Sequence, residues 1–192
     1  MPTPASLSTD KTVGVLLAPG CEEVEALAVV DALFRAGIRA DLIAVFEDLR
    51  VVSSHGVSIT CDLLLAQADL ASYELLFLPG GMPGTMNLAA NEQFCREIDR
   101  RAKAGLDLAA ICAAPSILAS RGHLKGRRAT ANPGFMEAIA EGGAHALEER
   151  VVIDGPFLTS RGAGTAFELG FAIVERFLGE KAAGAVREAL VY

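Results

Sequence analysis

The sequence has no surplus of positive charge and no long apolar run, and each absence excludes a class of partner. Its 17 Lys and Arg residues are outnumbered by 24 Asp and Glu residues, for a net charge of −7. Proteins that bind nucleic acid or anionic lipid present a surplus of positive charge. The longest apolar runs are also far shorter than the roughly 20 residues that cross a bilayer. We therefore expect neither a nucleic acid nor a membrane as a partner.

Two further features are missing, a secretory leader and paired cysteines. Residues 1–10 have neither the basic start nor the apolar core of a signal peptide, so we expect a soluble cytoplasmic protein. They are rich in Pro, Ser and Thr, which predicts a disordered tail before a single domain over residues 11–192. None of the four cysteines has Cys-x-x-Cys spacing, which argues against a zinc knuckle or a redox pair. Each cysteine must therefore be judged by its own surroundings.

What the sequence does have is a regular alternation of two apolar patterns. Residues 11–17 form a short β-branched run that predicts a buried strand, and residues 22–36 place apolar side chains at helical spacing. We predict further strands at 40–45, 75–78, 106–111 and 157–159, a hairpin over 51–60, and helices after Asn91, from Pro115 and around Phe167 to Leu178. This alternation predicts an α/β sandwich, a parallel sheet with helices on both faces.

Ligands of such sheets bind beyond the carboxyl ends of the strands. Cys112 lies there, between an apolar strand and a predicted helix, which is the layout of a nucleophile elbow. A helix N-terminus can lower the pKa of a thiol and so supply a thiolate near neutral pH. The alternative is that Cys112 is a small buried side chain at the end of a core strand.

Two neighbouring segments offer groups that complement a nucleophile. Gly80 and Gly81 end another predicted strand, where their N–H groups are available to an oxyanion, although on these residues alone a plain turn is the better explanation. Glu22, Glu23 and Glu25 crowd the start of the first predicted helix, where the helix dipole stabilises negative charge. One of these carboxyls could face the crevice with a raised pKa, and the spacing does not choose among them.

Four segments of this sequence resemble the signature segments of the ThiJ/PfpI superfamily. They are Gly20-Cys-Glu-Glu-Val-Glu25, Leu78-Pro-Gly-Gly81, Ala110-Ile-Cys-Ala-Ala-Pro115 and Leu158-Thr-Ser-Arg-Gly-Ala-Gly-Thr165. The resemblance runs from about Lys11 to Val191 and is greatest to the branch of the Parkinson-disease-associated protein deglycase and its bacterial relatives. It implies a flavodoxin-like three-layer sandwich with a mainly parallel sheet, like that of the class I glutamine amidotransferases, and a homodimer.

The resemblance also implies roles for individual residues. Cys112 matches the reactive cysteine of the family and Glu25 matches the carboxylic acid that contacts it. Gly80, Gly81 and Ala113 match the backbone donors around the sulfur. The implied activity, for which we expect neither a cofactor nor a metal, is glyoxalase or deglycase chemistry on small reactive carbonyls or glycated amines. Cys112 is the nucleophile and Glu25 the acid and base.

At two positions the sequence departs from the family pattern, and each departure limits the activity that the resemblance implies. Ala113 stands where the protease-like branch has a His, so peptidase activity is not expected. Asn132 stands where the branch often has a His before a proline, so Glu25 must carry most of the proton transfer. We place Asn132, Arg161 and Cys21 as further candidates for the pocket, and we expect the three histidines, His55, His123 and His145, to be surface or turn residues.

A second hypothesis of another class uses the same residues. In it the protein is an oxidation sensor or a chaperone without turnover, in which Cys112 is oxidised and Glu25 hydrogen-bonds the product. The two hypotheses make different predictions for Glu25→Ala. Under the first hypothesis the substitution abolishes catalysis, and under the second it weakens the stability of the oxidised cysteine and changes no rate. The superfamily labels of thiazole biosynthesis and intracellular protease receive no support from the residues.

Overall fold

A computed structural model describes residue 4 and residues 6–192 of the chain. Part of the predicted disordered tail, residues 1–3 and residue 5, lies outside the described residues. In its described part Ser8 donates its N–H to the carbonyl of Gly37 at 2.9 Å. The disorder of the tail stays a prediction.

Seven strands form one sheet in the order β10-β11-β7-β6-β1-β2-β5, in which every neighbouring pair is parallel except β10 and β11. Their bounds are β1 Thr12–Leu17, β2 Arg39–Ala44, β5 Leu63–Leu64, β6 Leu75–Leu78, β7 Asp107–Ile111, β10 Val151–Asp154 and β11 Phe157–Ser160. Two smaller pairs complete the strands, the antiparallel β3 Arg50–Val52 with β4 Ser58–Thr60, and the parallel β8 Arg128–Ala129 with β9 His145–Ala146.

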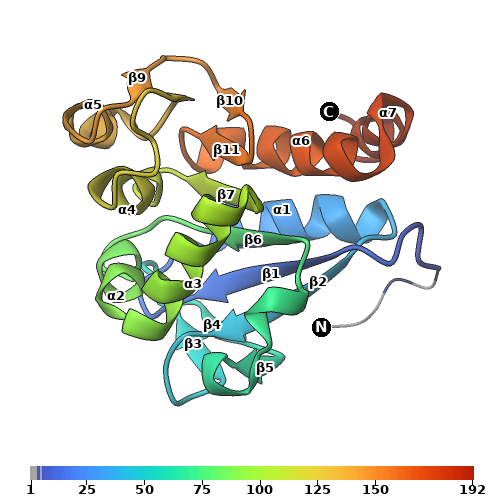
Figure 1. Ribbon diagram of the computed structural model, residues 1–192. Coiled ribbons are helices and arrows are strands. Elements are labelled where there is room, and N and C mark those ends of the chain that lie inside the picture. Colours follow the sequence, from blue (N-terminus) through green and yellow to red (C-terminus); the bar gives the residue numbers. More distant parts are fainter. Residues whose placement is uncertain (1–3, 5) are drawn as a thin grey trace.

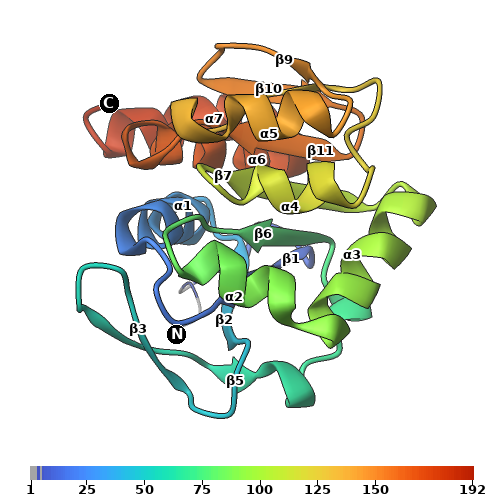
Figure 2. The ribbon, with the colours of Figure 1, turned by 90° about the vertical axis from the view of Figure 1, so that its left-hand side faces the viewer.

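Helices cover both faces of the large sheet (Figure 1). On one face lie α1 Glu23–Arg35, α6 Ala166–Leu178 and α7 Glu180–Ala189. On the other lie α2 Gly84–Ala90, α3 Glu92–Ala104, α4 Pro115–Ser120 and α5 Met136–Glu141, which Figure 2 brings to the viewer's side. Because successive residues of a strand point to opposite faces, each strand contributes to two cores: Val15 packs toward α1, and Leu16 toward the other layer. The predicted three-layer sandwich is confirmed.

The elements that the sequence predicted are found within one or two residues of their predicted bounds. The hairpin turns at His55 and Gly56, where Gly56 has a φ of +80° that favours glycine. Short elements with weak local signals were missed, among them α2, whose N-cap Pro83 supplies no side-chain hydrogen bond, and the edge strand β10. No helix in the described part of the chain is long and apolar enough to span a bilayer.

Candidate active site

The candidate site lies where four neighbouring strands end. Strands β11, β7, β6 and β1 are adjacent and parallel, so the loops after their carboxyl ends meet at one edge of the sheet. These loops carry the segments that the sequence singled out around residues 20–25, 79–82, 112–114 and 160–165. The fold therefore brings together groups that are far apart in the chain.

Cys112 stands directly after β7 in a backbone conformation that non-glycine residues rarely adopt. Its φ is +64°, in the left-handed region. Two hydrogen bonds hold it there: its N–H donates to the carbonyl of Ser160 at 3.0 Å, and its carbonyl accepts from the N–H of Asn132 at 2.9 Å. A strained residue that its surroundings fix so firmly is typical of functional positions, and this turn has the geometry of a nucleophile elbow.

The three carboxyls at the start of α1 have three different partners. Glu22 is the N-cap and accepts from the N–H of Glu25 at 2.6 Å. Glu23 contacts Nδ1 of His55 at 3.0 Å. Glu25 is 1% exposed, its Oε2 accepts from the N–H of Gly80 at 2.9 Å, and its side chain shares a hydrogen bond with the Cys112 thiol. The structure thus selects the carboxyl that the spacing left open.

The buried position of Glu25 changes its acidity. Burial raises its pKa to about 7, and hydrogen bonds from the Cys112 thiol and from the N–H groups of Gly80 and Ala163 act against that rise. Near neutral pH this carboxyl therefore exists in both protonation states. A group with a pKa near the working pH is the most effective general acid and base.

The acidity of Cys112 differs from the sequence-based prediction. Burial, the charge of Glu25 and the hydrogen bond to Glu25 raise the pKa of the thiol to about 12, whereas the N–H groups of Gly81 and Ala113 act against the rise. The prediction of a lowered pKa is wrong, because it counted the helix N-terminus and omitted the desolvation and the adjacent carboxylate. In this site the thiol proton is directed at Glu25.

The two glycines after β6 have separate tasks. A Cβ on Gly80 would lie 2.6 Å from Cβ of Cys112 and 2.8 Å from Oε2 of Glu25, so only glycine lets the strand end pass this close. Its N–H is engaged by Glu25, which differs from the predicted role as a donor to the sulfur. Gly81, at a φ of +88°, and Ala113 are the residues whose N–H groups face the thiol.

Asn132 and Arg161 line a second part of the site. They border an open cavity of about 380 Å³, together with Pro133, Arg150 and the loop 162–165. Gly162 lies beside both Asn132 and Glu25, since a Cβ on it would be 3.7 Å from Nδ2 of Asn132 and 3.8 Å from Oε1 of Glu25. The structure therefore brings Asn132 to the thiol–carboxyl pair, whereas the Arg161 guanidinium donates to the carbonyl of Glu148 at 3.1 Å on the exposed side of the cavity. The role of Arg161 in the pocket stays a prediction.

Cys21 adjoins the site through its backbone, since a Cβ on Gly81 would lie 2.6 Å from the carbonyl carbon of Cys21. It is 1% exposed, and its pKa is raised to about 12 by burial and by the charges of Cys61 and Glu23. Its carbonyl accepts from the N–H of Ser54 at 2.8 Å, which ties it to the β3–β4 hairpin. The structure groups this cysteine with the hairpin and with Cys61.

The histidines lie in turns and at short strands. His55 is exposed at the hairpin turn, His123 contacts Asp99 at 2.7 Å, and His145 is in β9. The ligand atoms of Glu22, Glu23 and His55 lie within 4.8 Å of one another, as metal ligands can, but the cap and the Glu23–His55 contact already account for this grouping. The absence of a metal stays a prediction.

Sequence reasoning missed the residue that holds the loop over Glu25. Arg150 donates to the carbonyl of Gly164 at 2.6 Å and to both carboxylate oxygens of Glu168, and Tyr192 donates to the same carboxylate at 2.7 Å. The N–H of Ala163, in this loop, contributes to the hydrogen bonding of Glu25. No local pattern marks Arg150, because its role depends on contacts with residues far along the chain.

The chain is similar to known proteins over most of its length. A model described as the DJ-1/PfpI family matches residues 11–176. The chain is 39% identical to Protein DJ-1 homolog B of Arabidopsis thaliana over 87% of its own length and 38% of that protein. It is 32% identical to a Caenorhabditis elegans protein named glutathione-independent glyoxalase DJR-1.2, over 90% of the chain and 92% of that protein.

Solved structures agree with these matches. The structure titled Toxoplasma gondii DJ-1, oxidized, superposes with a TM-score of 0.89 at 30% identity, over 95% of this chain and 98% of that one. The chain spans less than half the length of two Arabidopsis relatives that it matches, 38% of homolog B and 47% of homolog A.

Proposed function

This chain belongs to the DJ-1/PfpI family, and from that premise we propose that it is a cysteine-dependent enzyme of the glyoxalase or deglycase type. Its substrates are small reactive carbonyls, 2-oxoaldehydes above all, or glycated amines. The observation that carries the proposal is the hydrogen bond between the buried Glu25 carboxyl and the Cys112 thiol, in a turn that exposes N–H groups to the sulfur. The name of the C. elegans relative supports the same chemistry.

The first step forms a bond between Sγ of Cys112 and the aldehyde carbon. As sulfur attacks, the ionised Glu25 takes the thiol proton along the hydrogen bond that joins the two side chains. Because the proton leaves as sulfur attacks, no free thiolate has to form beforehand, and the reaction can proceed although the pKa of the thiol is high. The N–H groups of Gly81 and Ala113 face the sulfur and stabilise the oxyanion that develops on the former aldehyde oxygen.

The second step moves hydrogen between the two carbons of the 2-oxoaldehyde. Protonation of the oxyanion by Glu25 gives a hemithioacetal; Glu25 then removes the proton from the carbon bonded to sulfur and returns it to the neighbouring carbon. As the carbon proton returns, the hydroxyl proton of the hemithioacetal passes by way of Glu25 to the former ketone oxygen. The former aldehyde carbon becomes a thioester and the ketone becomes an alcohol, so the reaction consumes no external oxidant. Water hydrolyses the thioester, which releases the 2-hydroxy acid and restores the thiol.

A homodimer is part of the same proposal. Helix α1 exposes the apolar side chains of Val24 and Leu27, at 50% and 39%, around a hollow that Phe167 also lines. An apolar patch on the outer face of a helix favours a protein contact. The test is the mass in solution, for which we expect twice 20.1 kDa. Leu27→Asp should halve that mass, and a monomeric wild type would contradict the dimer.

One observation favours a second candidate, the oxidation sensor. Cys112 is partly exposed, and a protonated Glu25 beside it can donate a hydrogen bond to an oxidised sulfur. A solved relative carries the word oxidized in its title. Under this candidate Glu25 stabilises an oxidation product, and no substrate is turned over.

The deciding experiment measures methylglyoxal consumption and lactate formation without glutathione. It compares the wild type with Cys112→Ser and with Glu25→Ala. We expect many turnovers of lactate per protein molecule in the wild type and none in either variant. If methylglyoxal disappears only in proportion to protein thiols, the enzyme proposal is wrong and the sensor takes its place.

A further inference from the structure

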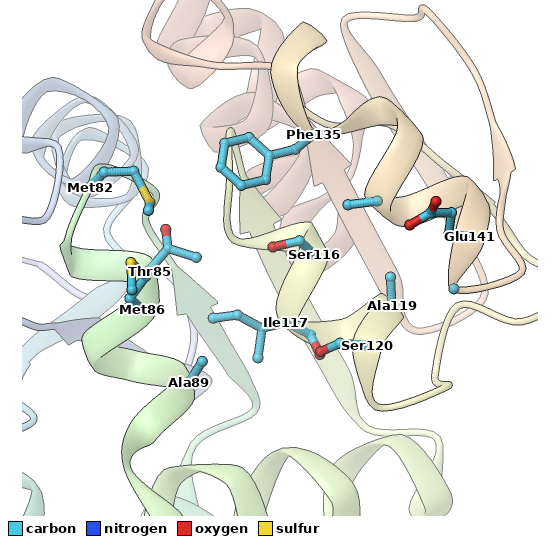
Figure 3. Close-up of a pocket in the computed structure, with 12 residues that line it drawn as sticks. Met82, Thr85, Met86, Ala89, Ser116, Ile117, Ala119, Ser120, Phe135 and Glu141 are labelled. Atoms are coloured by element: carbon cyan, nitrogen blue, oxygen red, sulfur yellow. The ribbon is translucent and has the colours of Figure 1, made fainter.

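A cavity of about 500 Å³ opens between α2 on one side and α4 and α5 on the other (Figure 3). Its size lies within the range of small-molecule sites in proteins, which is roughly 300–1,000 Å³. Neither Cys112 nor Glu25 is among its lining residues, so it is distinct from the thiol–carboxyl pair. The steps proposed above use none of its side chains.

The cavity nevertheless adjoins the residues whose N–H groups face the thiol. Met82, which lines it, directly follows Gly81, whose N–H faces the sulfur. Ser116, another lining residue, donates its hydroxyl to the carbonyl of Ala113 at 2.7 Å. A substrate held at Cys112 would therefore have this cavity on the α2–α4 side.

The α4–α5 side of the cavity, to which Phe135 belongs, is tied to the same turn. Phe135 belongs to a short helical segment whose preceding residue, Asn132, donates its N–H to the carbonyl of Cys112 at 2.9 Å. Figure 3 shows the Phe135 ring projecting into the space between Met82 and Ser116. The backbone on both sides of the cavity is thus connected to the turn that carries the reactive sulfur.

The lining is suited to an uncharged, apolar group. Ile117, Phe135 and three alanines supply hydrocarbon surface, and the flexible chains of Met82 and Met86, 46% and 61% exposed, form the wall on the α2 side. Thioether chains adapt to ligands of different shape. The Glu141 carboxylate lies at the α5 end, where it would repel an anion.

One polar atom in the wall has no partner. The Thr85 hydroxyl is buried, its residue is 4% exposed, and within the described part of the chain no hydrogen bond satisfies its oxygen. A buried hydroxyl without a partner costs about 1–3 kcal/mol, so its retention points to a group that it meets on binding. Figure 3 shows its oxygen on the cavity side, between the ends of Met82 and Met86.

We propose that this cavity binds the neutral aryl or branched-alkyl substituent of a 2-oxoaldehyde whose aldehyde carbon reacts with Cys112, with the Thr85 hydroxyl donating to a polar atom of the bound molecule. The inference rests on the proposed function. It makes the enzyme selective for 2-oxoaldehydes larger than methylglyoxal, because only these reach the apolar walls.

The kinetic test uses phenylglyoxal and methylglyoxal with a matched pair of variants on α5. Ala138 lines the cavity and is exposed, so Ala138→Phe fills the space without disturbing the core; Ala140→Phe adds the same ring two residues away, outside the lining. Burial of an aromatic ring contributes on the order of 2 kcal/mol, roughly thirtyfold. We expect Ala138→Phe to lower kcat/KM for phenylglyoxal about tenfold or more and to leave methylglyoxal within twofold, and Ala140→Phe to change neither.

A binding test separates this inference from the proposed function. Acetophenone has no aldehyde and serves as an unreactive probe for the Cys112→Ser protein, observed through the labelled methyl groups of its methionines. We expect saturable shifts at Met82 and Met86 that Ala138→Phe abolishes. Thr85→Val should weaken binding by roughly five- to tenfold, the loss of one hydrogen bond, without lowering the melting temperature.

The possible results distinguish the proposed cavity site from the proposed enzyme activity. Saturable binding in this cavity with no turnover of either aldehyde by the wild type would retain the site and overturn the enzyme. Turnover of methylglyoxal with no acetophenone shift, or an equal loss of both substrates in Ala138→Phe, would retain the enzyme and overturn the site.

Discussion

Cys21 and Cys112 both follow the carboxyl ends of central strands, and burial is the main reason that both thiol pKa values are raised to about 12. Their surroundings are otherwise different. Cys21 is fully buried at the hairpin beside Cys61 and Glu23. Cys112 is partly exposed, in a left-handed turn, and shares a hydrogen bond with Glu25.

This difference teaches that the acidity of a thiol does not by itself mark a nucleophile. What distinguishes Cys112 is an acceptor for its proton and a pair of N–H groups near its sulfur. The charges that act on Cys21 are those of Cys61, Glu23 and Glu22, and these groups do not combine a proton acceptor with a pair of N–H groups at the sulfur. The predictions below test whether the distinction holds.

The largest expected effect comes from exchanging each sulfur for oxygen. Cys112→Ser should lower kcat/KM for methylglyoxal about a thousandfold or more, because the covalent step is lost. Cys21→Ser should stay within about threefold, provided that it folds, which its melting temperature checks. Equal losses in two folded variants would abolish the distinction between the cysteines.

The acceptor of the thiol proton is tested next. Glu25→Gln should lower kcat/KM by roughly 10²–10⁴, the usual contribution of general acid–base catalysis. In the wild type kcat/KM should rise with pH as Glu25 ionises, with a midpoint near its pKa of about 7. The variant should lose that limb of the pH profile. A wild-type profile that is flat between pH 5 and 8 would rule out Glu25 as the base.

The same carboxyl should make stability depend on pH. Its folded pKa of about 7 lies above the ordinary value of 4.5, so between these values the folded protein holds a proton that the unfolded chain has released. The free energy of unfolding should therefore fall between pH 4.5 and 7 by about 3 kcal/mol relative to Glu25→Gln. Chemical unfolding of both proteins at pH 5 and pH 8 measures it, and a constant difference would mean that Glu25 is charged throughout.

The smallest effect concerns the close approach of the strand end to the turn. Gly80→Ala would place a methyl group 2.6 Å from Cβ of Cys112 and 2.9 Å from the carbonyl oxygen of Ile111, and should destabilise the fold by about 1–3 kcal/mol. Gly184→Ala, in α7 where a Cβ meets nothing within 4 Å, should instead stabilise it by up to about 1 kcal/mol. Similar results for both would show that Gly80 is not tightly confined.

Much of the fold could be predicted from local patterns. The apolar runs that became β1, β6 and β7 and the helical spacing of α1 are strong signals, because each records a face that must be buried. The missed helix α2 lacks a capping side chain, and β10 is a four-residue edge strand. Such elements form because they pack against the neighbouring core. A short stretch of sequence carries no signal of that packing.

Of the candidate site, as of the fold, one part could be predicted from the sequence and another could not. The position of Cys112 after a strand and the resemblance to the family identified the pair with Glu25. The direction of the thiol pKa was predicted wrongly, since it depends on burial and on a carboxylate that only the fold brings near. Arg150 was missed because its hydrogen bonds join segments far apart in the chain, and Thr85 because the burial of its hydroxyl is a property of the folded chain.

By itself, the sequence determined the alternation of strands and helices, because hydrophobic periodicity is a property of neighbouring residues. It also determined which residue types stand at the strand ends. Local spacing left three glutamates open, and only the tertiary structure decided the separate partners of Glu22, Glu23 and Glu25, and that Gly80 serves Glu25 while Gly81 faces the sulfur. Proton affinity and hydrogen bonding depend on distance and desolvation in space, and these exist only once the layers have packed.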